Sequence, residues 1–274
     1  MNRTLATLTF ATLLAPTLGQ AATATAQITD EQYATVLAGP WRAKENSVRD
    51  GYRHPEQTLK FFGLQHNQTV IEITPGGGWY SEILAPLLKD HGHYIAALQA
   101  PASGEYYQKA AEGLRQKFTA DPEHYAKATF VEFDPKAPVL GKPGSADRVL
   151  TFRNVHNWVM ADDAPQMFAA FFKVLKAGGV LGVVDHRAKD GADLASIKQS
   201  GYLPTDYVVK LATDAGFKLE AQSEINANPK DTKDYPGGVW TLPPSLKLGD
   251  QDKAKYVAIG ESDRLTLRFV KPGK

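Results

Sequence analysis

A regular alternation of short apolar strands and amphipathic helical segments most constrains what this chain can fold into. Strands are predicted at residues 69–73, 93–98, 128–133, 148–152, 180–184, 217–221 and 264–270. Apolar residues at helical spacing predict helices at residues 79–89, 106–118, 164–175 and 205–215. Strands that alternate with helices form a mostly parallel sheet with helices on both faces. We therefore predict an α/β fold with seven strands.

Segments outside this alternation carry their own signals. Thr29, three residues before a glutamine, predicts a helix N-cap, and Pro55 predicts the first residue of another helix. Arg53 and His54 are interpreted as surface charge beside that proline, with a lid over a site as the alternative. Residues 226–259 are rich in Asn, Asp, Lys, Gly and Pro, which predicts a solvated surface insertion.

The first 26 residues have the pattern of a secretory signal peptide. A basic start with Arg3 precedes a short apolar stretch, and small residues lead to possible cleavage sites after Ala24 and Ala26. Pro16 interrupts a stretch already shorter than the roughly 20 residues of a membrane span, so a membrane anchor is the less favoured alternative. We predict a leader at residues 1–26 and one domain at 27–274. The mature protein is expected to be exported and not inserted in the membrane, in the periplasm if the source is Gram-negative.

Charge and cysteine content exclude several functions. The chain has 31 Lys and Arg against 30 Asp and Glu, and loss of Arg3 with the leader balances them. A balanced charge argues against a nucleic-acid partner, because phosphate neutralisation needs a basic surplus. No cysteine occurs, which excludes thiolate catalysis and cysteine-ligated metal sites.

A glycine turn, Pro75-Gly76-Gly77-Gly78, follows the first predicted strand and precedes a helix. Glycine lets the backbone approach a ligand closely, and ligands of parallel sheets bind beyond the carboxyl ends of the strands. We therefore expect a ligand site here, with a ligand-free tight turn as the alternative. No Gly-Lys-Ser/Thr sequence follows the glycines, so a P-loop is excluded.

This turn resembles the first motif of the class I S-adenosylmethionine-dependent methyltransferases, an acidic residue followed by spaced glycines. Glu72, Gly76 and Gly78 match that motif, and Thr74 replaces its first glycine. The resemblance covers most of the chain. It implies a Rossmann-like seven-stranded sheet with an antiparallel last strand.

Two further segments are similar to those of predicted exported bacterial methyltransferases. That group carries a Pro-Gly-Gly-Gly-Trp-Tyr turn, here residues 75–80, and a Val-Asp-His-Arg segment, here residues 184–187. The resemblance to this group implies S-adenosylmethionine as the cofactor and a small molecule as the substrate.

The resemblance also assigns cofactor residues. Glu72 and the glycine backbone would contact the methionine part, Asp134 the adenine amino group, and Asn154 the sulfonium side. The family usually has a carboxylate after the second strand for the ribose hydroxyls, but this chain has the neutral Gln99 there. The absence of a carboxylate at this position also argues against a nicotinamide dehydrogenase. The implied cofactor residues are Glu72, Thr74, Gly76, Gly77, Gly78, Trp79, Gln99, Asp134 and Asn154.

Two histidines follow neighbouring predicted strands, His156 after residues 148–152 and His186 after residues 180–184. Histidine is suited to accept a proton near neutral pH. We predict that one of the two is a catalytic base and that Asp185 orients or charges it. The alternative for each histidine is a cap on a strand end or a bond to loop backbone. The predicted substrate residues are Tyr80, Trp158 and Arg187. Trp158 would shape the wall of the substrate site.

Metal chemistry is an alternative built on the same residues. His156, Asp185 and His186 could bind zinc or iron, whereas His91 and His93 flank a glycine and are interpreted as solvated. No H-E-x-x-H motif occurs, and we predict no metal site. The leading hypothesis is a methyltransferase. The alternatives are an exported binding or degenerate methyltransferase-fold protein without catalysis, and a metal-assisted hydrolase or lyase.

Overall fold

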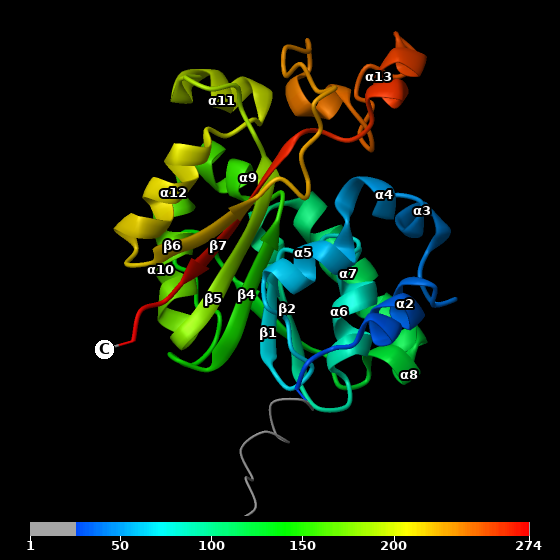
Figure 1. The fold of residues 1–274 in the computed structure, drawn as a ribbon, viewed down its shortest axis with the longest axis vertical. Helices are drawn as coiled ribbons and strands as arrows, with labels where there is room; N and C mark the ends of the chain where they lie inside the picture. The colour runs from blue at the N-terminus through cyan, green and yellow to red at the C-terminus, as the bar shows by residue number, and fades with distance from the viewer. Residues whose placement is uncertain (1–25, 274) are drawn as a thin grey trace, which may run out of the picture.

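Seven strands form one sheet in the computed structural model, which describes residues 26–273 apart from the side chains of residues 196–198 (Figure 1). The strands are β1 (Thr69–Ile73), β2 (His93–Gln99), β3 (Thr129–Phe133), β4 (Ala146–Phe152), β5 (Leu175–His186), β6 (Lys218–Ser223) and β7 (Arg264–Val270). Their order across the sheet is β3-β2-β1-β4-β5-β7-β6. β7 runs antiparallel to β5 and β6, and the other pairs are parallel. The predicted fold class is therefore confirmed.

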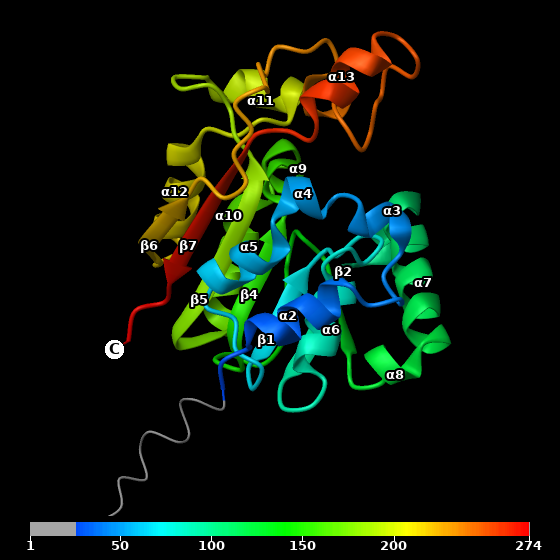
Figure 2. The same cartoon turned by 45° about the vertical axis from the view of Figure 1, so that its right-hand side comes forward.

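Helices cover both faces of the sheet (Figures 1 and 2). One face packs against α2 (Asp30–Leu37), α5 (Pro55–Phe61), α6 (Ser81–Leu88), α7 (Glu105–Ala120) and α8 (Pro122–Tyr125). The other packs against α9 (Val155–Met160), α10 (Ala164–Val174) and α12 (Thr205–Asp214). Successive strand residues point to opposite faces, so Val70 belongs to the first of these cores and Ile71 to the second.

Shorter helices complete the described residues. They are α3 (Lys44–Ser47), α4 (Asp50–Arg53), α11 (Leu194–Ser200), α13 (Lys253–Ile259) and the 3-10 helices η1 (Pro101–Ser103) and η2 (Gly238–Thr241). In both views α4, α11 and α13 lie beyond the carboxyl ends of the parallel strands.

Local signals at the N-terminal helices are confirmed. The Thr29 side chain accepts from the backbone N–H of Gln32 at 3.2 Å, and the Gln32 side chain accepts from the Thr29 N–H at 2.9 Å. This reciprocal pair satisfies donors that the first turn of α2 leaves unpaired. Pro55 begins α5 as predicted.

The prediction of a solvated insertion at residues 226–259 is corrected for its first half. Buried side chains occur there at Asn226, Asp231, Val239 and Leu242. The polar residues that suggested solvation pair with one another, with Tyr202 and with Asp263, which lies just before β7. This segment, from here on called the insertion, is mostly exposed only over residues 244–255.

No helix within residues 26–273 has the length and apolar character needed to cross a membrane. The predicted leader lies outside the described residues, except for Ala26.

Candidate active site

A cavity of about 570 Å³ opens beyond the carboxyl ends of β1, β4 and β5. Ligand pockets for small molecules typically measure roughly 300–1,000 Å³. Its walls come from the glycine turn, the residues that follow β4, the end of β5, the start of β7, the segment around α3 and α4, and the insertion. The cavity therefore lies where β1 and β4 leave the sheet toward opposite sides, which is the usual ligand position in such folds.

The glycine turn presents bare backbone to this cavity. A Cβ atom built on Gly76 or Gly77 would meet no atom within 4 Å, and both residues line the cavity. A Cβ on Gly78 would lie 2.6 Å from Leu114, so that glycine permits close packing of α7. Thr74, Gly76 and Gly78 have φ of 49°, 59° and 86°. Thr74 thus adopts the left-handed conformation at the position where the family has glycine.

Glu72 is a buried carboxyl on the cavity wall. It accepts hydrogen bonds from the hydroxyls of Tyr94 at 2.6 Å and Ser81 at 3.3 Å. Burial raises the pKa of Glu72 to about 7, against the two hydrogen bonds that lower it. A cationic group in the cavity would favour the ionised form.

The other predicted cofactor residues divide into two groups. Asn154 and Trp79 line the cavity, and Asn154 Nδ2 donates to the Ile73 carbonyl at 2.9 Å, which ties the end of β4 to the end of β1. Gln99 and Asp134 are not part of the lining. Asp134 is exposed, and its Oδ1 accepts from the Lys136 N–H at 2.9 Å. It caps a turn at the edge of the sheet.

Gln99 ends β2 and is buried, with an Oε1 atom that has no hydrogen-bond partner among the described residues. Burial raises the pKa of Tyr107, and the amide of Gln99 partly offsets that rise. Gln99 therefore stands behind Tyr107, which lines the cavity.

The two predicted histidines come together, with ring centroids 4.9 Å apart, and both line the cavity. His156 Nδ1 lies 2.8 Å from Oδ1 of Asp185, which is completely buried. A carboxylate accepts from Nδ1–H, so His156 keeps Nε2 free to take a proton. Asp185 also accepts from the backbone N–H of His186 at 2.7 Å and of His156 at 3.3 Å.

His186 is the less suitable base. Its Nδ1 lies 2.5 Å from the Ser262 hydroxyl. Burial, together with the neighbouring His156, Arg264 and Arg153, lowers the pKa of His186 well below its ordinary value. A histidine in this environment stays neutral at physiological pH and holds an added proton poorly.

The prediction that Trp158 shapes the substrate wall is corrected. The segment after β4 forms α9, and residues two apart on a helix point in nearly opposite directions. His156 therefore faces the cavity, while Trp158 packs in the core against Phe171, with ring centroids 5.6 Å apart. Trp240 of the insertion takes the wall position, 6.0 Å from the His156 ring. Tyr80 lines the cavity as well, stacked on Phe152.

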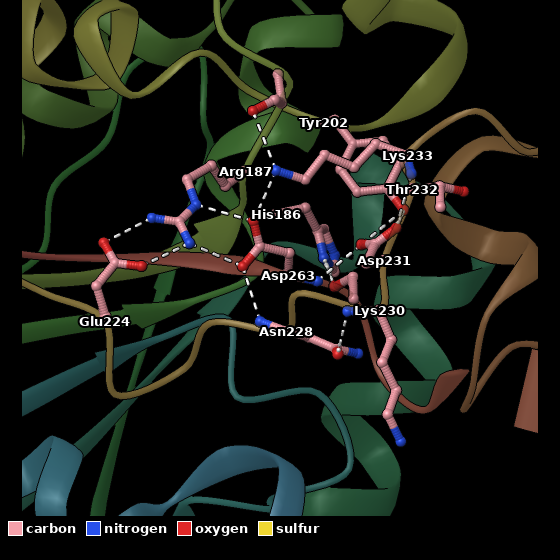
Figure 3. Close-up of polar contacts among 12 residues, drawn as sticks. His186, Arg187, Tyr202, Glu224, Asn228, Lys230, Asp231, Thr232, Lys233 and Asp263 are labelled. Atoms are coloured by element: carbon pink, nitrogen blue, oxygen red, sulfur yellow. Dashed lines mark hydrogen bonds and ion pairs between the residues drawn. The ribbon is translucent and has the colours of Figure 1, made fainter. Parts of the chain in front are cut away.

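The prediction that Arg187 contacts the substrate is also corrected. Arg187 is absent from the cavity lining and takes part in an ion-pair network (Figure 3). Its guanidinium donates to Asp263 at 2.8 and 2.9 Å and to Glu224 at 2.7 Å. Lys233 Nζ lies 2.7 Å from the same Asp263 carboxylate. The network holds the insertion against the end of β5 and thereby places Trp240 over the cavity.

Among residues 26–273, His156, Asp185 and His186 form the group whose ligand atoms, within 4.8 Å of one another, could hold a metal ion. The Asp185 oxygens already accept three hydrogen bonds. These contacts suit a carboxylate that orients His156. His93 contacts the Thr129 hydroxyl at 2.8 Å.

Sequence reasoning missed the arginines of the cavity. Arg49, Arg153 and Arg264 all line it, and Arg53, interpreted as surface charge, is 2% exposed. Position carried a signal for two of them. Arg153 directly follows β4, and Arg264 begins an antiparallel strand, whose first residue meets the carboxyl ends of the parallel strands.

No family model matches the chain, and no curated protein sequence matches it. Solved structures are similar in fold. A methyltransferase dependent on S-adenosylmethionine from Aquifex aeolicus has a TM-score of 0.54 at 14% identity, over 81% of this chain and 92% of that one. The [4+2]-cyclase SpnF has a TM-score of 0.58 at 13% identity, over 86% of each chain.

A third solved structure is the O-methyltransferase NcsB1 of neocarzinostatin biosynthesis, in complex with S-adenosylmethionine and 2-hydroxy-5-methyl naphthoic acid. Its TM-score is 0.52 at 14% identity, over 83% of this chain and 55% of that one. The chain thus has the fold of S-adenosylmethionine-dependent methyltransferases. SpnF, named a cyclase, illustrates that this fold does not determine the reaction.

Proposed function

We propose that this protein is an S-adenosylmethionine-dependent methyltransferase of a small molecule. The observation that carries the proposal is the open backbone of Gly76 and Gly77 beside the buried carboxyl of Glu72, at the end of β1. The solved complex of NcsB1 with S-adenosylmethionine supports the same cofactor in this fold.

The residues at this end of the sheet fit the cofactor. Glu72 would pair with the ammonium of the methionine part, because a buried carboxyl with a raised pKa gains most from a cation. The space over Gly76 and Gly77 would admit the methionine part of the cofactor, which carries this ammonium group. Gln99 lies outside the cavity lining, so no ribose contact is assigned to it.

When bound, S-adenosylmethionine supplies an electrophilic methyl group. The residues of this chain then prepare the acceptor. Nε2 of His156 takes a proton from a hydroxyl or ammonium group of the acceptor. Asp185 stabilises the imidazolium that results. His186 remains neutral beside it. Trp240 and the insertion cover the cavity and limit its exposure to water.

Calorimetric titration of the purified full chain with S-adenosylmethionine and S-adenosylhomocysteine tests the proposal. We expect saturable binding of both. Absence of heat at millimolar concentration would refute it. A binding protein without catalysis would bind both compounds but release no S-adenosylhomocysteine from S-adenosylmethionine with any of a panel of hydroxyl and amine acceptors.

We further propose that the protein is exported, on the strength of residues 1–26. Subcellular fractionation with N-terminal sequencing of the mature protein checks this. An intact N-terminus in the cytosolic fraction would contradict export, and it would place the enzyme where its cofactor is made.

A further inference from the structure

Four arginines meet at one wall of the cavity around a single carboxylate. Glu261 is buried and accepts from Arg49 Nε at 2.7 Å and from Arg53 Nε at 3.0 Å. Arg264 Nη2 donates to the same carboxylate. Arg153 is the fourth, and all five residues line the cavity. Glu261 is therefore contacted by three arginines, and Arg153 adds a fourth positive charge to the same wall.

Arg153 is the least satisfied member of this group. Its side chain makes no hydrogen bond or ion pair with any residue in the described part of the chain, and only its backbone is bonded, from its N–H to the Val184 carbonyl at 2.7 Å. Its φ of 61° is an unfavourable conformation for a residue with a Cβ. Burial, and then the charge of Arg264, lowers the pKa of Arg153 to about 10. The guanidinium thus stays charged at neutral pH.

Two donors of the neighbouring arginines are buried without partners within residues 26–273, Arg53 Nη1 and Arg264 Nε. Arg53 is 2% exposed and Arg264 is 1% exposed. Buried donors are nearly always hydrogen-bonded in folded proteins, so these two atoms indicate a missing acceptor. The half-buried Arg153 lines the same cavity with no side-chain partner among the described residues. The nearby carboxyls are engaged elsewhere, Glu72 with Tyr94 and Asp185 with the histidines.

The position of the wall points to the acceptor side of the cavity. Arg264 pairs in register with His186 between β7 and β5, and Arg153 follows β4. The glycine turn lies on β1, on the other side of β4. A ligand group held by these arginines would lie beside the two histidines.

We propose that this wall, formed by Arg49, Arg53, Arg153 and Arg264, binds the oxyanion of a small acidic molecule, a carboxylate or a phosphate, and that this molecule is the methyl acceptor. The part of the inference that calls the ligand an acceptor rests on the proposed function. Binding of an oxyanion does not. The rival ligand is the carboxylate of the cofactor itself.

The test uses the full chain and calorimetric titration with benzoate and with inorganic phosphate, each without cofactor. We expect at least one of them to bind. Arg153→Met should weaken that binding by about tenfold or more, the loss of one charge-assisted hydrogen bond. Its thermal midpoint should not fall, because the variant loses no described side-chain contact. Arg115→Met is the matched control, since Arg115 pairs with Glu132 on the exposed surface. It should leave the affinity unchanged.

Lack of binding by both anions, or equal binding by wild type and Arg153→Met, would overturn the oxyanion site. If benzoate binds and phosphate does not, the wall selects a carboxylate, and the reverse result shows that it selects a phosphate.

A second arm separates the acceptor from the cofactor. S-adenosylhomocysteine carries a carboxylate, and methylthioadenosine carries none. We expect Arg153→Met to leave the affinity for both within about twofold. Weaker binding of S-adenosylhomocysteine alone would assign the wall to the cofactor and overturn the acceptor inference. If wild type binds an anion but not S-adenosylhomocysteine, the proposed function fails while the oxyanion site stands.

Discussion

His156 and Asp185 form a buried pair in which Nδ1 of the imidazole lies 2.8 Å from Oδ1 of the carboxylate. His156 lies at the start of α9, just after β4, and Asp185 lies near the end of β5. The pair links two neighbouring strands at the cavity. It fixes which nitrogen of His156 faces the ligand.

Replacing Asp185 by Asn should therefore disable the base. An amide has one acceptor oxygen for three donors, so the variant loses the contact that selects the His156 tautomer. We expect turnover to fall by about 10²-fold or more, with the affinity for S-adenosylhomocysteine within about twofold. Nitrogen chemical shifts of the His156 ring report the tautomer directly. An unchanged tautomer and unchanged turnover would show that Asp185 only supports the fold.

His186 should make stability depend on pH. Its pKa in the folded protein lies well below its ordinary value of 6.5, so the unfolded chain binds the proton more readily. The contribution of neutral His186 to the free energy of unfolding is complete above about pH 6.5 and is lost as the pH falls below that value. His186→Asn should flatten this acid slope in urea unfolding measured from about pH 5 to pH 8. His91→Asn, at a more exposed position, should retain it. An unchanged slope in His186→Asn would contradict the shift.

Glu72 should have the opposite dependence for the same physical reason, burial. Its folded pKa of about 7 lies above the ordinary 4.5, so the folded protein holds the proton longer. Stability therefore falls as the pH rises from about 4.5 to about 7. Glu72→Gln should raise the free energy of unfolding at pH 8 by about 2–3 kcal/mol and weaken S-adenosylhomocysteine binding. The exposed Glu123→Gln should do neither. A loss of stability in Glu72→Gln at pH 8 would refute this account.

Gly77→Val tests the open turn with little effect on the fold. Gly77 does not share the positive φ of Gly76, and its Cβ would meet no atom within 4 Å. We expect stability within about 0.5 kcal/mol of wild type and at least tenfold weaker binding of S-adenosylhomocysteine. Gly113→Ala in α7 is the control. It should stabilise by about 0.5–1 kcal/mol and bind normally. Wild-type affinity in Gly77→Val would show that the ligand lies elsewhere.

Asp263→Asn should loosen the insertion, because Asp263 is buried between Arg187 and Lys233. Burial alone would raise the pKa of Asp263, but these two cations lower it below the ordinary 3.8. Its contribution is therefore present above about pH 3.8 and is lost on acidification. We expect a loss of about 3 kcal/mol at neutral pH and faster hydrogen exchange over residues 238–244. Glu224→Gln removes the exposed partner of Arg187 and should cost under about 1 kcal/mol. Equal effects of the two variants would contradict the role of Asp263.

Local patterns predicted the framework well. β1 and β7 begin and end at the predicted residues, and the reciprocal bonds at Thr29 follow from residues three apart. The failures share one cause. Trp158 and Arg187 were assigned to the site from their positions after strands, but their direction depends on a short helix and on partners more than thirty residues away.

The sequence by itself determined the alternation of strands and helices, the glycine turn and the two histidines at strand ends, because each depends on spacing within a few residues. The tertiary structure alone decided which polar residues meet. A chain with balanced total charge places four arginines around Glu261, since antiparallel β7 returns its first residue to the carboxyl ends of the parallel strands. Balanced composition therefore says nothing about the charge of the cavity, which depends on how distant segments pack.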